Sequence, residues 1–464
     1  MLVEKITQKY QRALVLGCAK PASEMNSTLE TRRSIRRFLI GICIFAFALR
    51  VTLVLAAGTY KVSEDEDHFG FGWEMGRVAR SLAESRGFSS PLPLPSGFTA
   101  MVGPVYPILL AAIFKVFGVY STASAIAARV LQSGFSSATC VFIYLCGRDT
   151  GSDRVGRWAA IVWAVFPLNI FFTIMKVWET SLTALLMAAL FWLMLSSRNM
   201  LSVKRWVAIG AILGVAALTN TSLVILVVPF GLFALWKHRV RSLGPLLVGA
   251  LSCVAVVSPW LIRNYIKFDK FMLRSNFPLE FRIGNNDLSF GQKIESFHPS
   301  NTPSLNEHWS QVGESQFMEE EREANSRFLT KHLGRFVLAT LNRVVNYWTG
   351  AWILPIEGYS NEWSVIIGIS TLSVLGCIGL CGLMSSRNPI GILYLGCLLL
   401  YPLVYCVTTT QPRFYHALTP LLISLAVYWA VSFWDKFGEI ASAHKRRRNQ
   451  AGMQKTNGVL QISF

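Results

Sequence analysis

The chain has 464 residues, of which 52% are hydrophobic and only 15% are charged, whereas a soluble domain carries about 25% charged residues. This composition, with a mean hydropathy of +0.42, excludes an ordinary soluble domain. The net charge of +18 at first suggests nucleic-acid binding. However, the basic residues cluster beside apolar segments, as they do in the cytoplasmic loops of membrane proteins. We therefore predict a polytopic membrane protein with no nucleic-acid partner.

Apolar runs that can cross a bilayer as helices recur along the chain. The first begins after 37 polar and basic residues and lacks the small-residue cleavage site of a signal peptide, so we interpret it as a membrane anchor. The predicted spans are residues 38–57, 122–147, 157–174, 180–196, 206–219, 221–236, 243–262, 363–384, 389–409 and 413–434. The pattern predicts an all-α transmembrane helical bundle of about ten spans.

Two further apolar stretches, residues 104–120 and 335–355, would raise the number of spans to 11 or 12. Adding only the first would move the loop that holds Arg148, Arg154 and Arg157 to the outer side of the membrane. Basic loops usually stay in the cytoplasm. We therefore predict that both stretches lie outside, on or dipping into the membrane surface, with interfacial amphipathic helices in the first outer loop.

Ten spans place both basic termini on the cytoplasmic side. The extracytoplasmic segments are then residues 58–121, 174–179 and 263–362, which hold 19 of the 26 acidic residues. The predicted organisation is a cytoplasmic tail (1–37), an N-terminal membrane module that includes the first outer loop (38–262), a long outer loop (263–362), C-terminal spans (363–434) and a basic cytoplasmic tail (435–464).

The stretch SEDEDHFGFGWEMGRVARSLAESRGF (63–88) follows the first span and opens with four consecutive acids, 64–67. Apolar residues then recur at helical spacing: Phe71, Met75, Val78 and Leu82. This pattern predicts an amphipathic helix that lies along the outer interface. Two ordinary explanations of its acids stay open. The first explanation is that the acidic run 64–67 is a solvated loop. The second is that Glu74 forms a surface ion pair with Arg77, one helical turn away.

Several phrases of the sequence together resemble a known family. They are SLAESRGF at the end of the amphipathic helix, GPVYPILLAAIFKVFG (103–118), SPWLIRNY (258–265) and QPRFYHALTPLL (411–422). In this order, and with this placement at the outer face, they resemble the GT-C glycosyltransferases. Within that group the resemblance is to the branch of the protein O-mannosyltransferases, the lipid A aminoarabinose transferase and their bacterial relatives.

The resemblance implies an enzyme of the bacterial inner membrane whose active site faces the periplasm. Such enzymes transfer a sugar from a polyprenyl-phosphate lipid to an acceptor hydroxyl, with inversion at the anomeric carbon. Residues 38–262 would then be the catalytic module, and the loop 263–362 would shape the acceptor site. The acceptor is a protein, a lipid or a glycan, and the sequence identifies neither it nor the sugar.

The family uses a carboxylate in the first outer loop, where a base must take the proton of the acceptor hydroxyl. Asp65 and Asp67 lie further upstream of the amphipathic helix than this pattern expects. We therefore predict Glu74 as the first candidate for the general base and Asp67 as the second. Glu179, in KVWETSLTALL (176–186), stands where the family has a second acid, although acids are also common at helix N-termini.

The phosphate of the donor should meet cations at the outer interface. The candidates are Lys176, Arg263 and Arg413, which stand at outer span ends, together with the intramembrane Arg50 and Arg129. Anchoring at the interface is the alternative role for Arg263 and Arg413.

Divalent-metal use stays open, because His68, His298 and His416 are candidate ligands but show no tight spacing with acids. Two other classes of function also stay open. One is a transporter or flippase for a lipid-linked or amphipathic substrate, which would need polar groups near the bilayer midplane. The other is a non-catalytic scaffold.

Overall fold

The computed structural model describes residues 22–62, 69–196, 201–354 and 362–460. Within these ranges the chain is all-α, with one isolated antiparallel bridge between Ser89 and Phe98 and no β-strand. The predicted fold class is therefore confirmed. The predicted site residue Asp67, with the rest of the acidic run and His68, lies outside the described residues.

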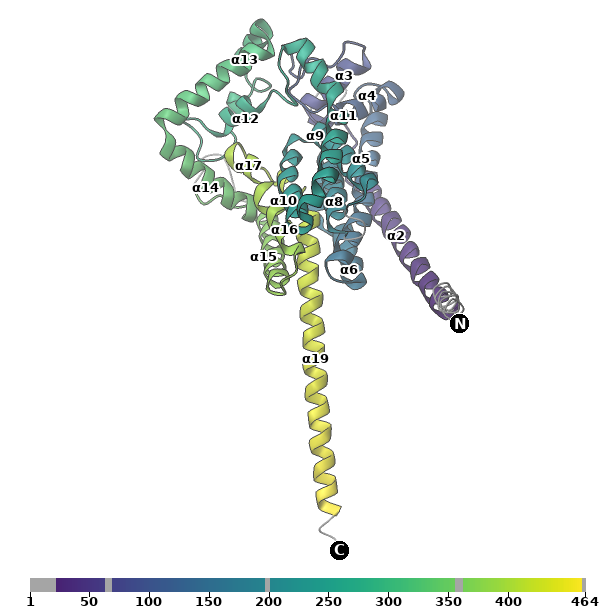
Figure 1. Ribbon diagram of the computed structural model, residues 1–464. Coiled ribbons are helices and arrows are strands. Elements are labelled where there is room, and N and C mark those ends of the chain that lie inside the picture. The colour runs from purple at the N-terminus through teal and green to yellow at the C-terminus, as the bar shows by residue number, and fades with distance from the viewer. Residues whose placement is uncertain (1–21, 63–68, 197–200, 355–361, 461–464) are drawn as a thin grey trace, which may run out of the picture.

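Most helices pack side by side as a bundle (Figure 1). They are α2 (Ala22–Ala56), α5 (Thr122–Thr150), α6 (Asp153–Val165), α7 (Pro167–Ile174), α8 (Thr180–Leu195), α9 (Val203–Thr219), α10 (Val227–His238), α11 (Leu243–Phe268), α15 (Trp363–Ser385), α16 (Ile390–Leu400), α17 (Leu403–Val407), α18 (Pro412–Tyr415) and α19 (Thr419–Leu460). Each predicted span overlaps one of these helices or a consecutive pair of them.

By length and composition, five helical segments of the described chain can cross a membrane, and the bent pair α6–α7 makes a sixth if it counts as one span. The five are Arg32–Ala56, Thr122–Thr150, Thr221–Phe268, Trp363–Ser385 and Ile390–Val407. The third is 48 residues long and contains two of the predicted spans. The chain is thus a multi-pass membrane protein, and its total of ten crossings stays a prediction.

The predicted span 157–174 is bent by 49° between α6 and α7. Pro167 begins α7, and Phe166 before it is extended, with φ −66° and ψ 120°. Proline lacks an amide hydrogen and disfavours the helical conformation in the residue before it, so α6 ends at Val165. After α7 the chain runs through a short segment to Glu179 at the start of α8.

The remaining helices gather at one end of the bundle or beside it. They are α3 (Glu74–Ala83), α4 (Val105–Phe117), α12 (Phe277–Gly284), α13 (Pro303–Lys331) and α14 (Leu333–Thr349). Figure 1 shows α3, α12 and α13 at the end opposite to the start of α2 and the final turns of α19. Helices from both long predicted outer loops therefore lie at the same end of the molecule.

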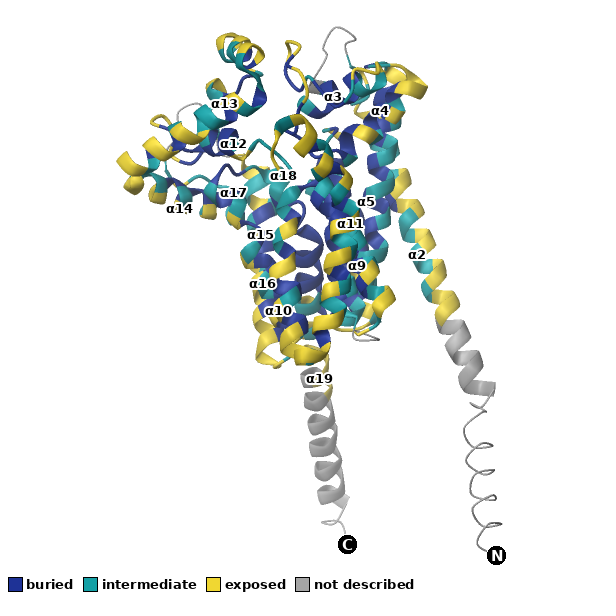
Figure 2. Cartoon of the chain, turned by 45° about the horizontal axis from the view of Figure 1, so that its top comes forward, coloured by how far each residue is buried: buried dark blue, intermediate teal, exposed yellow. Residues whose placement is uncertain are grey.

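Large apolar side chains are exposed on the bundle helices, among them Ile44 of α2, Leu247 of α11 and Ile367 of α15. Figure 2 shows buried residues inside the bundle and exposed ones along its outer faces. On α14, Leu333, Val337 and Leu341 are exposed, whereas Asn342 and Arg343 on another face are buried. The helix α14 is thus amphipathic, as helices at a membrane surface commonly are.

Candidate functional site

A cavity of about 520 Å³ opens where the two outer loops meet the bundle. Seven chain segments line it, and they are widely separated in the sequence: 73–75, 101–102, 176–179, 220–224, 273–280, 293–301 and 404–414. Its charged lining residues are Glu74, Lys176, Glu179, Arg274, Glu280, Lys293, Glu295 and Arg413, and the buried His298 also lines it. The cavity is therefore polar and carries both signs of charge, at the end of the bundle predicted to be extracytoplasmic.

Four of the six predicted site residues line this one cavity: Glu74, Glu179, Lys176 and Arg413. Asp67 lies outside the described residues. Arg263 is not a lining residue. The sequence therefore identified residues that the tertiary structure brings together, although they come from three distant parts of the chain.

Glu74 reaches the cavity because the backbone before α3 packs tightly on the segment that precedes α8. Gly72 has a φ of +84°, and a Cβ atom there would lie 2.3 Å from the carbonyl oxygen of Val177. Only glycine allows this approach. From the other side, Gln132 of α5 donates from Nε2 to the carbonyl oxygens of Lys176 and Trp178, at 2.9 Å each. These contacts hold Glu74 and Glu179 at one cavity.

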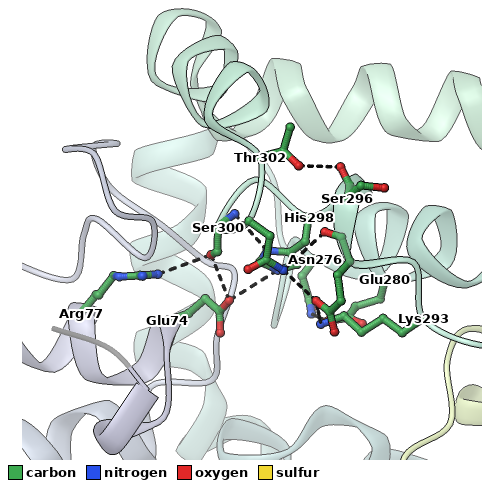
Figure 3. Close-up of polar contacts among 11 residues, drawn as sticks. Glu74, Arg77, Asn276, Glu280, Lys293, Ser296, His298, Ser300 and Thr302 are labelled. Carbon is green, nitrogen blue, oxygen red and sulfur yellow. Dashed lines mark hydrogen bonds and ion pairs between the residues drawn. The ribbon is translucent and has the colours of Figure 1, made fainter. Parts of the chain in front are cut away.

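The carboxylate of Glu74 contacts the later outer loop (Figure 3). Its Oε1 lies 3.4 Å from Nε2 of His298, and Ser300 Oγ donates to the same oxygen at 3.4 Å. Arg77 Nη1 donates to Ser300 Oγ at 3.4 Å and to the carbonyl oxygen of Pro91 at 3.2 Å. Ser300 thus bridges Glu74 and Arg77, which the sequence suggested as a direct surface pair.

The surroundings of Glu74 favour its charged form. Burial alone would raise the pKa of its carboxyl, but His298, a backbone hydrogen bond, Lys293 and Arg77 together hold that pKa below its usual value. Glu74 is therefore ionised at neutral pH and can accept a proton, as a general base must.

Glu179 has the opposite balance. Burial raises the pKa of its carboxyl, and the charges of Arg413 and Arg274 offset only part of that rise, while Glu74 adds to it. Glu179 is the N-cap residue of α8 but makes no side-chain capping hydrogen bond. Two carboxylates in one cavity thus differ in how strongly they hold a proton.

Arg413 presents a guanidinium at the wall of the cavity. Its Cζ lies 3.8 Å from the ring centroid of Trp178 and 4.9 Å from that of Phe414. Such contacts orient a guanidinium without using its N–H donors. Its buried Nε has no hydrogen-bond partner among the described residues. Burial, and then the charge of Arg413, lower the pKa of the neighbouring Lys176 ammonium.

Two more cations of the cavity were not among the sequence candidates. Arg274 donates from Nε to the carbonyl oxygen of Met101 at 3.0 Å, and Lys293 lies 3.2 Å from Glu295. Both stand in an irregular part of the outer loop, without periodicity or motif to mark them. For His298 the sequence suggests only a role as a metal ligand.

Arg263 occupies a structural position rather than the cavity wall. It donates from Nη1 to the carbonyl oxygen of Thr99 at 2.7 Å and from Nη2 to that of Phe88 at 2.9 Å. In the same segment, Thr99 Oγ1 and the amide of Ala100 donate hydrogen bonds to Glu314 of α13. Arg263 thus anchors the first outer loop, a role that differs from both the phosphate contact and the interface anchoring considered from the sequence.

The intramembrane arginines are likewise used in packing. Arg50 is fully buried and donates to Ser136 Oγ and to the carbonyl oxygen of Ala164, each at 3.0 Å. Arg129 donates to the carbonyl oxygen of Ile174 at 3.3 Å. Among the described residues no group of three or more His, Cys, Asp or Glu side chains is arranged to hold a metal ion.

The chain is similar to known proteins in one segment and in its fold. A family model described as dolichyl-phosphate-mannose-protein mannosyltransferase matches residues 101–262. No curated protein matches the chain significantly. The matched segment includes the wall of the cavity that holds Lys176 and Glu179.

Two structures of the oligosaccharyltransferase of Archaeoglobus fulgidus share the fold. One, tethered to an acceptor peptide, aligns with a TM-score of 0.55 at 13% identity over 86% of this chain and 50% of that one. The other, with an inhibitory peptide and dolichol phosphate, aligns with a TM-score of 0.50 at 13% identity over 89% and 52%. This chain thus spans about half the length of these archaeal structures.

ArnT of Cupriavidus metallidurans bound to undecaprenyl phosphate aligns over 82% of this chain and 77% of that one, at 14% identity and a TM-score of only 0.36. Residues 101–262 are thus similar to the dolichyl-phosphate-mannose-protein mannosyltransferase family, and the chain shares the fold of the archaeal structures.

Proposed function

We propose that this enzyme moves a sugar from a polyprenyl-phosphate donor to an acceptor hydroxyl in the cavity around Glu74, with inversion at the anomeric carbon. The observation that carries the proposal is the pairing in one cavity of an ionised, half-buried carboxylate, Glu74, with a guanidinium held by aromatic rings, Arg413. The archaeal fold neighbour has been seen with dolichol phosphate and with an acceptor peptide, which supports a lipid-phosphate donor and an outer acceptor.

In the proposed step, the acceptor oxygen attacks the anomeric carbon of the donor sugar while Glu74 takes the hydroxyl proton. The bond between the anomeric carbon and the phosphate oxygen breaks, and the polyprenyl phosphate leaves with the electron pair. Arg413 and Lys176 stabilise the charge that develops on the leaving phosphate. Glu179, whose pKa is raised, donates a hydrogen bond to the sugar or phosphate when it is protonated.

We assign the acceptor to a second cavity of about 730 Å³, which lies between α13 and the segment 270–281. Arg274 and Phe277 line both cavities, so a molecule bound in the second can reach the first. Phe277 is 54% exposed and is available to a ligand. Asp67, upstream of α3, is proposed to orient the acceptor or to help hold a cation. This assignment makes 263–362 the acceptor element and 38–262 the catalytic module.

We further propose that the protein resides in a bacterial inner membrane with the cavity facing the periplasm. The basic clusters beside the predicted spans support this orientation. Labelling of single cysteines introduced at positions 90, 152 and 310 should reach 90 and 310 from outside the cell and 152 only after permeabilisation. Labelling of 152 and 310 from the same side would contradict the ten-span topology.

The reaction itself is tested in proteoliposomes with a panel of undecaprenyl-phosphate-linked hexoses and pentoses and a crude membrane fraction as the acceptor source. The member with the highest turnover becomes the probe donor. Glu74→Gln and Asp67→Asn are compared at matched expression. Loss of turnover in Glu74→Gln assigns the base to Glu74. Loss only in Asp67→Asn assigns it to the acidic run, and retention in both refutes carboxylate catalysis from this loop.

A further inference from the structure

His298 lies in the loop between α12 and α13, more than 200 residues after Glu74 in the sequence. Its side chain is only 5% exposed. The backbone amide of Ser300 donates to His298 Nδ1 at 3.1 Å. An amide N–H can only donate, so Nδ1 must hold a lone pair, and the proton of the neutral imidazole lies on Nε2.

The Nε2 proton faces the candidate base. Nε2 lies 3.4 Å from Oε1 of Glu74, and the hydroxyl of Ser300 donates to that same oxygen at 3.4 Å. Figure 3 shows both side chains extending from the later outer loop toward Glu74 at the start of α3. The contacts are longer than well-formed hydrogen bonds, as is common at catalytic sites before substrate binds.

Burial favours a neutral imidazole at His298, whereas the groups around Glu74 favour an ionised carboxylate. Four groups face His298: Glu74, Lys293, Glu280 and Glu295. Burial outweighs the acids among them and holds the pKa of His298 below its usual value. Glu74 is faced in addition by Arg77 and by the carboxyl of Glu179. His298 therefore supports Glu74 as a hydrogen-bond donor at neutral pH.

We infer that His298 is a positioning residue for Glu74: its Nε2–H, with the Ser300 hydroxyl, holds Oε1 and thereby aims the carboxylate at the acceptor hydroxyl. The inference rests on the proposed role of Glu74 as the general base. It makes the base depend on the acceptor loop, because both supporting donors belong to that loop. The base is complete only when this loop packs against α3.

The substitutions His298→Gln and His298→Asn distinguish the effect of the Nε2–H hydrogen bond to Glu74 from the effect of losing the imidazole ring. The amide nitrogen of glutamine can occupy the place of histidine Nε2, whereas the shorter asparagine reaches only the place of Nδ1. We expect His298→Asn to lower kcat about 10- to 100-fold, because a misplaced catalytic group loses rate of this order. The KM for the donor should stay within about twofold, since the donor phosphate meets other residues. His298→Gln should recover most of kcat.

The acid limb of the pH profile of kcat/KM distinguishes a positioning role from a structural one. A residue that only supports the fold would not change the pH at which this limb falls. Loss of the Nε2–H donor in His298→Asn removes a stabiliser of the ionised Glu74, so the apparent pKa of the base should rise. The acid limb of kcat/KM should therefore move to higher pH in His298→Asn and stay near its wild-type position in His298→Gln.

A matched control lies on α13, where His308 Nε2 contacts Glu320 Oε2 at 2.6 Å and the two side chains are 41% and 40% exposed. His308→Asn breaks a similar His–Glu contact between two residues that line neither cavity, and it should leave turnover unchanged. The second control is the double variant with Glu74→Gln. If His298 acts through Glu74, adding His298→Asn to Glu74→Gln costs no further rate.

The outcomes separate this inference from the proposed function. If Glu74→Gln keeps wild-type turnover, the proposed base is wrong. If Glu74→Gln is inactive while both His298 variants keep wild-type kcat and pH profile, only the positioning role is overturned. Equal losses in His298→Gln and His298→Asn, or additive losses in the double variant, also overturn it. They would show that His298 supports the fold of the loop rather than the carboxylate.

Discussion

The two carboxylates of the cavity, Glu74 and Glu179, are the same residue type in opposite situations. Glu74 is packed against the later outer loop, where His298, Lys293 and Arg77 outweigh the effect of burial and hold its pKa below the usual value. For Glu179 burial prevails over Arg413 and Arg274, and its pKa is raised. Environments that separate the pKa values of two acids typically divide the acid and base roles between them.

The comparison also shows why position in a helix does not decide the protonation of an acid. Glu74 lies in the first turn of α3, and Glu179 is the N-cap residue of α8. Both helix N-termini should favour a negative charge by similar amounts. The difference arises instead from the partners that tertiary packing supplies, because Glu74 meets the Lys293 cation and the donors His298 and Ser300 of the later outer loop.

The largest expected effect separates the two acids in the reaction. Glu74→Gln should lower turnover by about 10² to 10⁴, the range of general base catalysis. Glu179→Gln keeps a hydrogen-bond donor in place of a carboxyl whose pKa is raised, so it should cost no more than about tenfold. The measurement is initial rate in proteoliposomes with the probe donor. A larger loss in Glu179→Gln than in Glu74→Gln would reverse the assignment.

The next effect concerns the cation beside Glu179. Arg413→Ala should raise the KM for the probe donor roughly 10- to 150-fold, because it removes a charge-assisted hydrogen bond worth about 1.5 to 3 kcal/mol. Binding of undecaprenyl phosphate alone should weaken in parallel. The matched control is Arg327→Ala, which removes an exposed α13 arginine paired with Glu323. Equal KM values for the donor in wild type and Arg413→Ala would show that Arg413 does not bind the donor phosphate.

Arg263 tests whether a cation near the cavity is enough to bind the donor. Arg263→Ala leaves the carbonyl oxygens of Thr99 and Phe88 without this donor, a loss of about 1 to 3 kcal/mol where such groups stay buried. It should lower the unfolding temperature in detergent, while the donor KM of the folded fraction stays near that of wild type. A raised KM for the donor without a lower unfolding temperature would show that Arg263 binds the donor phosphate.

The smallest effect is on the pH dependence of stability. Since the folded pKa of Glu74 is lowered, its contribution is present above the unfolded value and is lost as pH falls through the folded pKa. Glu74→Gln should therefore lower the unfolding temperature at pH 7. For Glu179 the folded pKa is raised, so ionisation destabilises the fold as pH rises through the window between the unfolded and folded values.

Glu179→Gln should accordingly raise the unfolding temperature at pH 7 and change it little near pH 3, where the wild-type carboxyl is protonated in both states. Thermal unfolding in detergent at the two pH values measures both variants. Unfolding temperatures that shift in the same direction in the two variants at pH 7 would show that the two acids do not differ in the way described.

Much of the fold follows from local patterns in the sequence. Apolar runs predicted the helices of the bundle, and the spacing of Phe71, Met75, Val78 and Leu82 predicted α3, whose first residue is Glu74. Such patterns are readable because helical periodicity and span length depend on residues close together in the chain. The candidates Glu74, Glu179, Lys176 and Arg413 followed from their places at helix ends, together with the family resemblance.

The support around those candidates was decided by tertiary structure alone. His298, Ser300, Arg274 and Lys293 stand in irregular loop without periodicity, and their meeting with Glu74 depends on how α12 and α13 pack over the bundle. Arg263 shows the converse, since its position at a span end suggested a ligand for phosphate but its donors are used by loop carbonyl oxygens. Sequence spacing reports neighbours one or two turns away, whereas burial and hydrogen-bond partners between distant loops exist only once the chain has folded.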